Sequence, residues 1–478
     1  MKFKTQVVSG VRWTSISVIA KAVLQLIQLM VLVRFLDKSD FGIMAILMIF
    51  INFSQVFVDF GISKAIVHYQ NISRSDLGTL YCVNVLFGLL IYCGLFICSE
   101  YIAFFYGEPL LIDYLRIIGI ILVIQSFGLQ FDVLFQKSLK FNIIAKIEIF
   151  AVFVSFCLSI ILAVNNFGVM ALIYPMIAMT IIKTFIFIFF GIKEYGFSFA
   201  FNIKCVRKYI VFGSYSVGDS VVSTISGQMD VILIGKFIGV ESLGIYNVLK
   251  DFILRPTQII NPIVTKVAFP LMSKINDNLN SLKYMYLKII NYTSSIAFPV
   301  YTIAIVMAED ILYVLLGEKW ISQAILLRIL AVWAMFYSIS SPVGALIMAA
   351  GKPNVSFYWN STRLIYMPVV VYISSFWGEI GVAVGMLIVS LLLYIPGWYF
   401  LIYRICNASL KEYSGSLLKS FCISTTIGIV VYFFIEFISN NLYIKLFFVL
   451  PLGFLILLFL NKYLNKDFYN AILDIIRK

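Results

Sequence analysis

Long apolar segments follow one another along the whole chain, separated by short connections that contain polar residues, Gly or Pro. A helix of about 20 mostly apolar residues is long enough to cross the hydrocarbon core of a bilayer. The pattern predicts an all-α polytopic membrane protein with about 14 transmembrane helices, at residues 14–35, 41–60, 79–99, 112–134, 144–164, 168–190, 209–234, 243–263, 286–307, 322–349, 356–376, 380–402, 418–437 and 442–461.

The composition agrees with this prediction, because 62% of the 478 residues are hydrophobic and only 12% are charged. Soluble domains contain roughly 45–50% apolar residues. No connection between the predicted spans is long enough to fold as a separate soluble domain. Any function must therefore reside in the helix bundle itself.

Basic residues are distributed unevenly between the two sides of the predicted bundle. With the amino terminus in the cytoplasm, 25 of the 36 Lys and Arg residues are assigned to inner segments. Because cytoplasmic loops carry the excess of Lys and Arg, both termini are predicted to be cytoplasmic. Topology then explains most of the net charge of +13, and nucleic acid is not expected as a partner. The other 11 basic residues are 5 in outer segments (Arg34, Lys38, Lys236, Lys319, Lys445) and 6 inside spans (Lys21, Arg116, Lys183, Lys250, Arg255, Arg328).

The chain contains an internal repeat. The segment LVRFLDKSDFGIMAI (32–46) is similar to IGKFIGVESLGIYNV (234–248) at an offset of 202, so that Gly42 matches Gly244. Residues 99–108 and 115–118 match 309–318 and 327–330 in the same order. An offset of six helices keeps both copies in one orientation, as in transporters built from two parallel lobes. We predict six-helix lobes at 1–200 and 201–405 around a central cavity, and an appended helix pair at 406–478.

Polar side chains form stripes at helical spacing on equivalent helices of the two copies. In the first copy the stripes contain Lys21, Gln25 and Gln28 on one helix and Asn52, Gln55 and Asp59 on the next. In the second copy they contain Asp219, Ser223, Ser226 and Asp230 on one helix and Asn247, Asp251, Arg255 and Gln258 on the next, with Lys250 just beside the second stripe.

Charged side chains in the middle of a span are costly when they face lipid, roughly 2.5–3.5 kcal/mol each on insertion scales. We therefore expect the stripes to line a polar cavity with Lys21, Lys250 and Arg255 as its cations, which suits an anionic, phosphate-bearing ligand. Asp251 and Arg255, at spacing i, i+4, could equally pair with each other. We expect Lys21 and Lys250 to be unpaired.

The motifs RFLDKSDFGIMAI and DVILIGKFIGVESLGIYNV, the segment AFPLMSKI (268–275) and the two-lobe plan resemble the multidrug/oligosaccharidyl-lipid/polysaccharide exporter superfamily, specifically its Wzx-type polysaccharide flippases. The resemblance implies a protein of the plasma membrane, the inner membrane in bacteria, that moves a polyprenyl-diphosphate-linked oligosaccharide outward by alternating access for surface polysaccharide assembly. It implies that Lys21, Lys250 and Arg255 contact the diphosphate, and it makes polysaccharide polymerase or assembly proteins possible partners.

Other functions fit the residues less well. The chain has no GxxxxGK[ST] motif for ATP and a single histidine, His68, so we expect neither a cofactor nor a metal and no covalent chemistry. Energy must then come from an ion gradient, the membrane potential or product consumption, with Asp59, Asp219 and Asp230 as candidates for ion coupling. The alternatives are an ion-coupled multidrug exporter, whose cationic substrates favour an acidic cavity, a membrane glycosyltransferase, and a structural scaffold.

Overall fold

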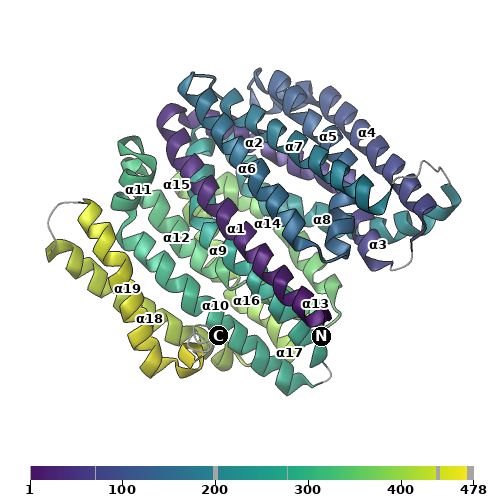
Figure 1. The fold of residues 1–478 in the computed structure, drawn as a ribbon. Coiled ribbons are helices and arrows are strands. Elements are labelled where there is room, and N and C mark those ends of the chain that lie inside the picture. The colour runs from purple at the N-terminus through teal and green to yellow at the C-terminus, as the bar shows by residue number, and fades with distance from the viewer. Residues whose placement is uncertain (1, 70–71, 197–202, 277, 438–441, 471–478) are drawn as a thin grey trace. The chain divides into compact units, whose positions relative to one another are not determined.

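The computed structural model describes residues 2–69, 72–196, 203–276, 278–437 and 442–470. Over these residues the chain is helical, and none of them lies in a β-strand. The chain forms two compact units (Figure 1), which we describe separately. The first comprises Met1–Asn247 and Asn360–Tyr372, and the second Val248–Trp359 and Ile373–Lys478.

The first unit is a bundle of antiparallel helices joined by short connections. Within it α1 packs along α6, α4 along α5, and both α5 and α6 along α7. Its helices are α1 (Lys2–Phe35), α2 (Lys38–Asp59), the short α3 (Ile62–His68), α4 (Arg74–Tyr106), α5 (Leu111–Lys137), α6 (Phe141–Val164), α7 (Met170–Tyr195), α8 (Ile203–Phe237) and the beginning of α9 (Val240–Lys274).

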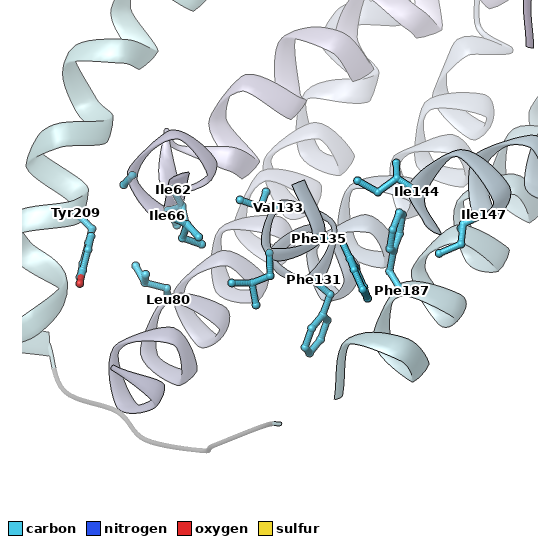
Figure 2. Packing of buried hydrophobic residues seen from close by; sticks show 12 residues of the cluster. Ile62, Ile66, Leu80, Phe131, Val133, Phe135, Ile144, Ile147, Phe187 and Tyr209 are labelled. Carbon is cyan, nitrogen blue, oxygen red and sulfur yellow. The ribbon is translucent and has the colours of Figure 1, made fainter. Parts of the chain in front are cut away.

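One buried cluster in this unit joins residues from six helices (Figure 2). Ile62 and Ile66 of α3 pack with Phe131 and Phe135 of α5, and Tyr209 of α8 closes the cluster. The Tyr209 hydroxyl donates a hydrogen bond of 3.1 Å to a carboxylate oxygen of Asp76. The cluster holds α3, which is too short to be stable alone, against the longer helices.

The second unit contains most of α9 and the remaining helices. Its apolar cluster of Met307, Ile423, Ile427, Val431 and Val449 joins α10 to the last two helices of the chain. The helices are α10 (Leu279–Val306), α11 (Ala308–Leu316), a 3-10 turn at Glu318–Gln323, α12 (Ala324–Ser338), α13 (Ser341–Ala349), α14 (Pro353–Ser375, which contributes 360–372 to the first unit), α15 (Gly378–Leu392), α16 (Tyr394–Gly397), a π-helical turn at Trp398–Tyr403, α17 (Arg404–Cys406), α18 (Leu410–Phe437) and α19 (Leu442–Leu464).

All 14 intervals predicted as spans lie on helices, which confirms the all-α membrane fold. Two of them are broken: 322–349 at the junction of α12 and α13, and 380–402 at a bend of 46° after α15. Among the described residues nine helices are long and apolar enough to cross a membrane, or ten when the bent pair is counted as one span. Helix α9, which carries Lys250, Asp251 and Arg255, is not among them. The number of 14 spans stays a prediction.

The two glycines matched by the repeat contact each other's helices. A Cβ on Gly42 would lie 1.8 Å from the carbonyl oxygen of Val240, and one on Gly244 would lie 1.8 Å from that of Lys38. The first turns of α2 and α9 therefore cross backbone to backbone, which only glycine permits, and Cα–H···O contacts stabilise such crossings. Reciprocal contacts of this kind arise when two equivalent segments are related by a twofold axis.

A second matched pair also supports the repeat. A guanidinium nitrogen of Arg116 lies 2.8 Å from a carboxylate oxygen of Glu100, and in the other unit Arg328 lies 2.9 Å from Glu309. The two matched arginines are thus ion-paired, each to an acid of its own unit. The lobe boundaries at residues 200 and 405 stay a prediction.

Candidate functional site

Charged side chains from four helices gather inside the first unit. The Lys21 amine of α1 lies 2.5 Å from a carboxylate oxygen of Glu148 on α6, and the Ser17 hydroxyl donates to the same oxygen at 2.9 Å. The charges of Asp132 on α5 and Lys183 on α7 act on this pair. With two cations and two anions the cluster is formally neutral, so each charge is partly compensated where water is scarce.

This geometry corrects one expectation. Lys21 is not unpaired, because its partner Glu148 stands 127 residues away in sequence and is brought close only by the packing of α1 on α6. Sequence reasoning also missed Asp132, Glu148 and Lys183 as members of a site. A signal existed, because Glu148 is the only acid in a 24-residue apolar helix, and ionisable residues inside spans indicate functional or paired groups.

The amide side chains predicted to line a cavity from α1 and α2 make hydrogen bonds within the first unit. Gln28 donates to the Ser159 hydroxyl at 2.9 Å, and Gln55 donates to the Gln125 side chain at 3.3 Å. Gln25 and Asn52 are half-buried. The first copy's polar stripes therefore connect neighbouring helices of one unit, which stabilises the bundle in an apolar medium.

The acids predicted for ion coupling have different surroundings. A carboxylate oxygen of Asp59 accepts a hydrogen bond of 3.1 Å from the backbone of Ser63, at the start of α3. Asp230 is buried and accepts a bond of 2.8 Å from the hydroxyl of Tyr246, which is also buried. The side chain of Asp219 lies outside the described part of the structure. Ion coupling by these residues stays a prediction.

The charged residues of α9 are partly enclosed. Lys250 is only 8% exposed, and its amine lies 5.9 Å from the centre of the Trp333 ring, a cation–π distance. It is therefore engaged with its own unit and does not stand alone as expected. Arg255 is half-buried and Asp251 is exposed. An ion pair between Asp251 and Arg255 stays a prediction.

The remaining predicted side chains vary in exposure. Ser226 is buried and donates to the backbone oxygen of Ser223 at 3.2 Å, whereas the Ser223 side chain is exposed. Asn247 is half-buried and Gln258 is exposed. The structure thus brings Lys21 together with acids of its own unit, and a cavity shared by all the stripes stays a prediction. Within the described ranges no three His, Cys, Asp or Glu side chains gather as a metal site would require.

Comparison with known proteins decides the family. The profile of a family described as "Polysaccharide biosynthesis protein" matches residues 31–326, more than half of the chain. The chain belongs to this family. The resemblance predicted from the motifs is thereby confirmed.

Relatives of this polysaccharide biosynthesis protein cover most of its length. The chain is 28% identical over 433 residues to the "Lipopolysaccharide biosynthesis protein WzxC" of Escherichia coli (strain K12), covering 90% of this chain and 88% of that protein. It is 28% identical over 428 residues to the "Teichuronic acid biosynthesis protein TuaB" of Bacillus subtilis (strain 168), covering 89% and 88%.

Solved structures share the fold of this family member. The lipid II flippase MurJ in an inward closed conformation has a TM-score of 0.78 at 18% identity and covers 95% of this chain and 98% of its own. A multidrug resistance MATE transporter of the MOP superfamily in an inward-facing conformation has a TM-score of 0.63 at 15% identity, covering 80% and 94%. The chain therefore shares the fold of these two proteins.

Proposed function

We propose that this chain moves a polyprenyl-diphosphate-linked oligosaccharide from the inner to the outer leaflet of the plasma membrane, for the assembly of a surface polysaccharide. Its family and its relatives WzxC and TuaB support this function. The observation that carries the proposal is the set of ionisable side chains held inside a transporter fold shared with a lipid II flippase. Such groups are expensive in a bilayer and mark substrate or ion pathways.

Transport of this lipid requires no covalent chemistry, only two conformations that expose the substrate site to opposite sides in turn. The sugar and diphosphate travel through the polar interior, while the polyprenyl chain stays in lipid. Lys250 and Arg255 on α9 bind the diphosphate in this proposal. Arg255 supplies a planar fork that can hold two phosphate oxygens at once, and Lys250 supplies a compact charge.

Lys21 forms an ion pair with an acid of the first unit. Its amine contacts Glu148, so it can bind a phosphate oxygen only by exchanging the carboxylate for the phosphate. A cation that must first release a carboxylate binds the substrate less tightly. Weak binding at several depths favours onward movement, since conduction requires that a ligand can also leave.

The coupling and the setting of the protein follow from the same proposal. Both termini lie in the cytoplasm, the energy comes from an ion gradient or the membrane potential through Asp59, Asp219 or Asp230, and polymerase or assembly proteins receive the product. Export of drugs is the second candidate, since MATE transporters share the fold. Named relatives in polysaccharide biosynthesis and the cationic side chains of α9 both favour the first.

A transport assay tests the proposal. The full chain is reconstituted into vesicles with a fluorescent lipid-linked oligosaccharide, and its arrival in the other leaflet is measured. We expect transport by the wild type and a loss of at least about tenfold in Lys250→Gln and Arg255→Gln, equivalent to about 1.4 kcal/mol. Lys319→Gln, at an exposed lysine outside α9, is the matched control. Wild-type rates in both α9 variants would refute the diphosphate role, and export of cationic dyes without lipid transport would favour the second candidate.

A further inference from the structure

An apolar hollow lies between α2 and α4 on the first unit. Its volume is about 600 Å³, within the roughly 300–1,000 Å³ typical of sites that hold small molecules. Phe50, Phe53 and Phe57 form its α2 wall at the spacing of successive helical turns. We call this hollow the α2–α4 groove.

Aromatic contacts at both ends define the groove. At one end the ring of Phe60 stacks on that of Phe87 with centroids 5.0 Å apart, and at the other Phe50 meets the edge of Tyr106 at 6.4 Å. Between these contacts Gly94 of α4 has no side chain, and a Cβ placed on it would meet nothing within 4 Å. The two helices thus leave a space between them that the chain itself does not fill.

The groove is elongated along α4. Its α4 residues run from Leu90 to Phe105, which is about 22 Å along the helix at 1.5 Å per residue. The hydrocarbon core of a bilayer is about 30 Å thick, so the groove has the length of a chain that reaches across most of it. Tyr101 stands 74% exposed at its rim, so the groove opens to the surface that faces lipid.

A cation stands at the Phe105 end. The amine of Lys236, at the end of α8, donates a hydrogen bond of 2.5 Å to the backbone oxygen of Phe105 and lies 4.7 Å from the centre of the Phe105 ring. Lys236 is exposed. An ammonium has three donors, so this contact leaves donors for a phosphate. Lys236 is also one of five basic residues predicted on the outer side, so this end of the groove is predicted to lie in the outer leaflet.

We propose that the α2–α4 groove binds the isoprenoid chain of a polyprenyl phosphate, with the phosphate at Lys236. This inference rests on the proposed function, because it takes the carrier of the sugar to be a polyprenyl lipid. An isoprenoid carries a methyl branch and a double bond in every unit, and its methyl and vinyl hydrogens can contact the faces of the three phenylalanine rings. A linear acyl chain lacks these methyl branches.

Photolabelling of the purified full chain in lipid nanodiscs tests the groove. The probe is a polyprenyl monophosphate with a diazirine in its chain, and labelled peptides are mapped by mass spectrometry. We expect adducts on residues 50–57 and 90–105. Gly94→Trp should reduce labelling at least about tenfold, equivalent to about 1.4 kcal/mol. Ile97→Trp is the control, because Ile97 is 67% exposed on the same helix and does not line the groove. Gly94→Leu repeats the test with a smaller side chain if the tryptophan variant fails to fold.

Two further arms identify the ligand. Unlabelled polyprenyl phosphate should compete with the probe, whereas phosphatidylglycerol at the same concentration should not. Lys236→Gln should weaken labelling by the polyprenyl phosphate probe but not by the corresponding polyprenol probe. Equal competition by phosphatidylglycerol, or labelling that Gly94→Trp leaves unchanged, would overturn the inference.

The transport assay separates this inference from the proposed function. Transport by the wild type together with absent groove labelling would refute the groove alone. Groove labelling without any transport of lipid-linked oligosaccharide would refute the function while leaving a polyprenyl phosphate site in place.

Discussion

The pair of Lys21 and Glu148 gives the sharpest test of how this fold holds charge inside a membrane. About three quarters of each side chain is shielded from solvent, and the two charged atoms are 2.5 Å apart. Together with Asp132 and Lys183, the pair forms a formally neutral cluster. Lys21→Met therefore leaves an excess negative charge, and Glu148→Gln leaves an excess positive one. The double variant is formally neutral again. Removing one partner of a buried pair costs about 3–5 kcal/mol, and the partial exposure here reduces our expectation to about 2–4 kcal/mol.

The assay is a double-mutant cycle on the full chain in detergent, with unfolding followed by gel filtration after heating. We expect each single variant to be destabilised and the double variant to recover at least about 1 kcal/mol relative to the sum of the two. Lys146→Met is the control, because this lysine of α6 is exposed and its amine lies 5.6 Å from the centre of the Trp13 ring. Its loss should cost less than about 1 kcal/mol. Purely additive losses would refute the argument that the pair is coupled.

The same variants separate structure from transport. If Lys21 also binds the diphosphate, the double variant will recover stability but will not restore surface polysaccharide in cells that lack the wild-type gene. If Lys21 serves only the fold, stability and polysaccharide will return together. The second result would remove Lys21 from the proposed substrate site and leave Lys250 and Arg255.

Three other predictions concern the framework around the site. Gly244→Ala places a Cβ 1.8 Å from a carbonyl oxygen and should lower the stability measured in thermal unfolding by about 1–3 kcal/mol. Gly218→Ala, whose Cβ meets nothing within 4 Å, should leave the stability unchanged. Equal stability of the two variants would contradict the close crossing. Tyr246→Phe removes the hydroxyl that binds the buried Asp230 carboxylate and should cost about 1–3 kcal/mol, a loss that Asp230→Asn should partly relieve in the same measurement. Ser409→Ala removes the hydroxyl that caps α18 and should lower stability by about 1 kcal/mol, seen as faster amide exchange in its first turn; unchanged exchange would show that the cap is not needed.

The repeat illustrates what can be found without a structure. Gly42 and Gly244 match at a constant offset in sequence, and the structure gives both the same close backbone contact. The matched Arg116 and Arg328 likewise form equivalent ion pairs. Equivalent residues make equivalent contacts because each copy repeats the same local helix geometry. The sequence could not reveal that the glycines contact each other's helices, because nothing in a single chain's pattern states which helix a residue meets.

The polar stripes show the opposite limit. Their residues lie at helical spacing on α1 and α2, but Gln28 and Gln55 bond to neighbouring helices of their own unit. A stripe at helical spacing says only that one face is polar, and that face is equally suited to water, to a ligand or to another helix. Hydropathy likewise could not place the breaks after α12 and α15, since both sides of each break are apolar.

The sequence by itself determined the helical membrane architecture, the internal repeat, the family and a predicted orientation. These follow from short-range physics: an apolar segment in lipid must satisfy its backbone hydrogen bonds internally, and the helix does so within four residues. Only the tertiary structure decided which buried charges are compensated and where the surface is hollow. Glu148 neutralises Lys21 because α1 and α6, far apart in sequence, pack together. Gly94 leaves a groove beside α2 because the spacing between α2 and α4 is encoded by no local pattern.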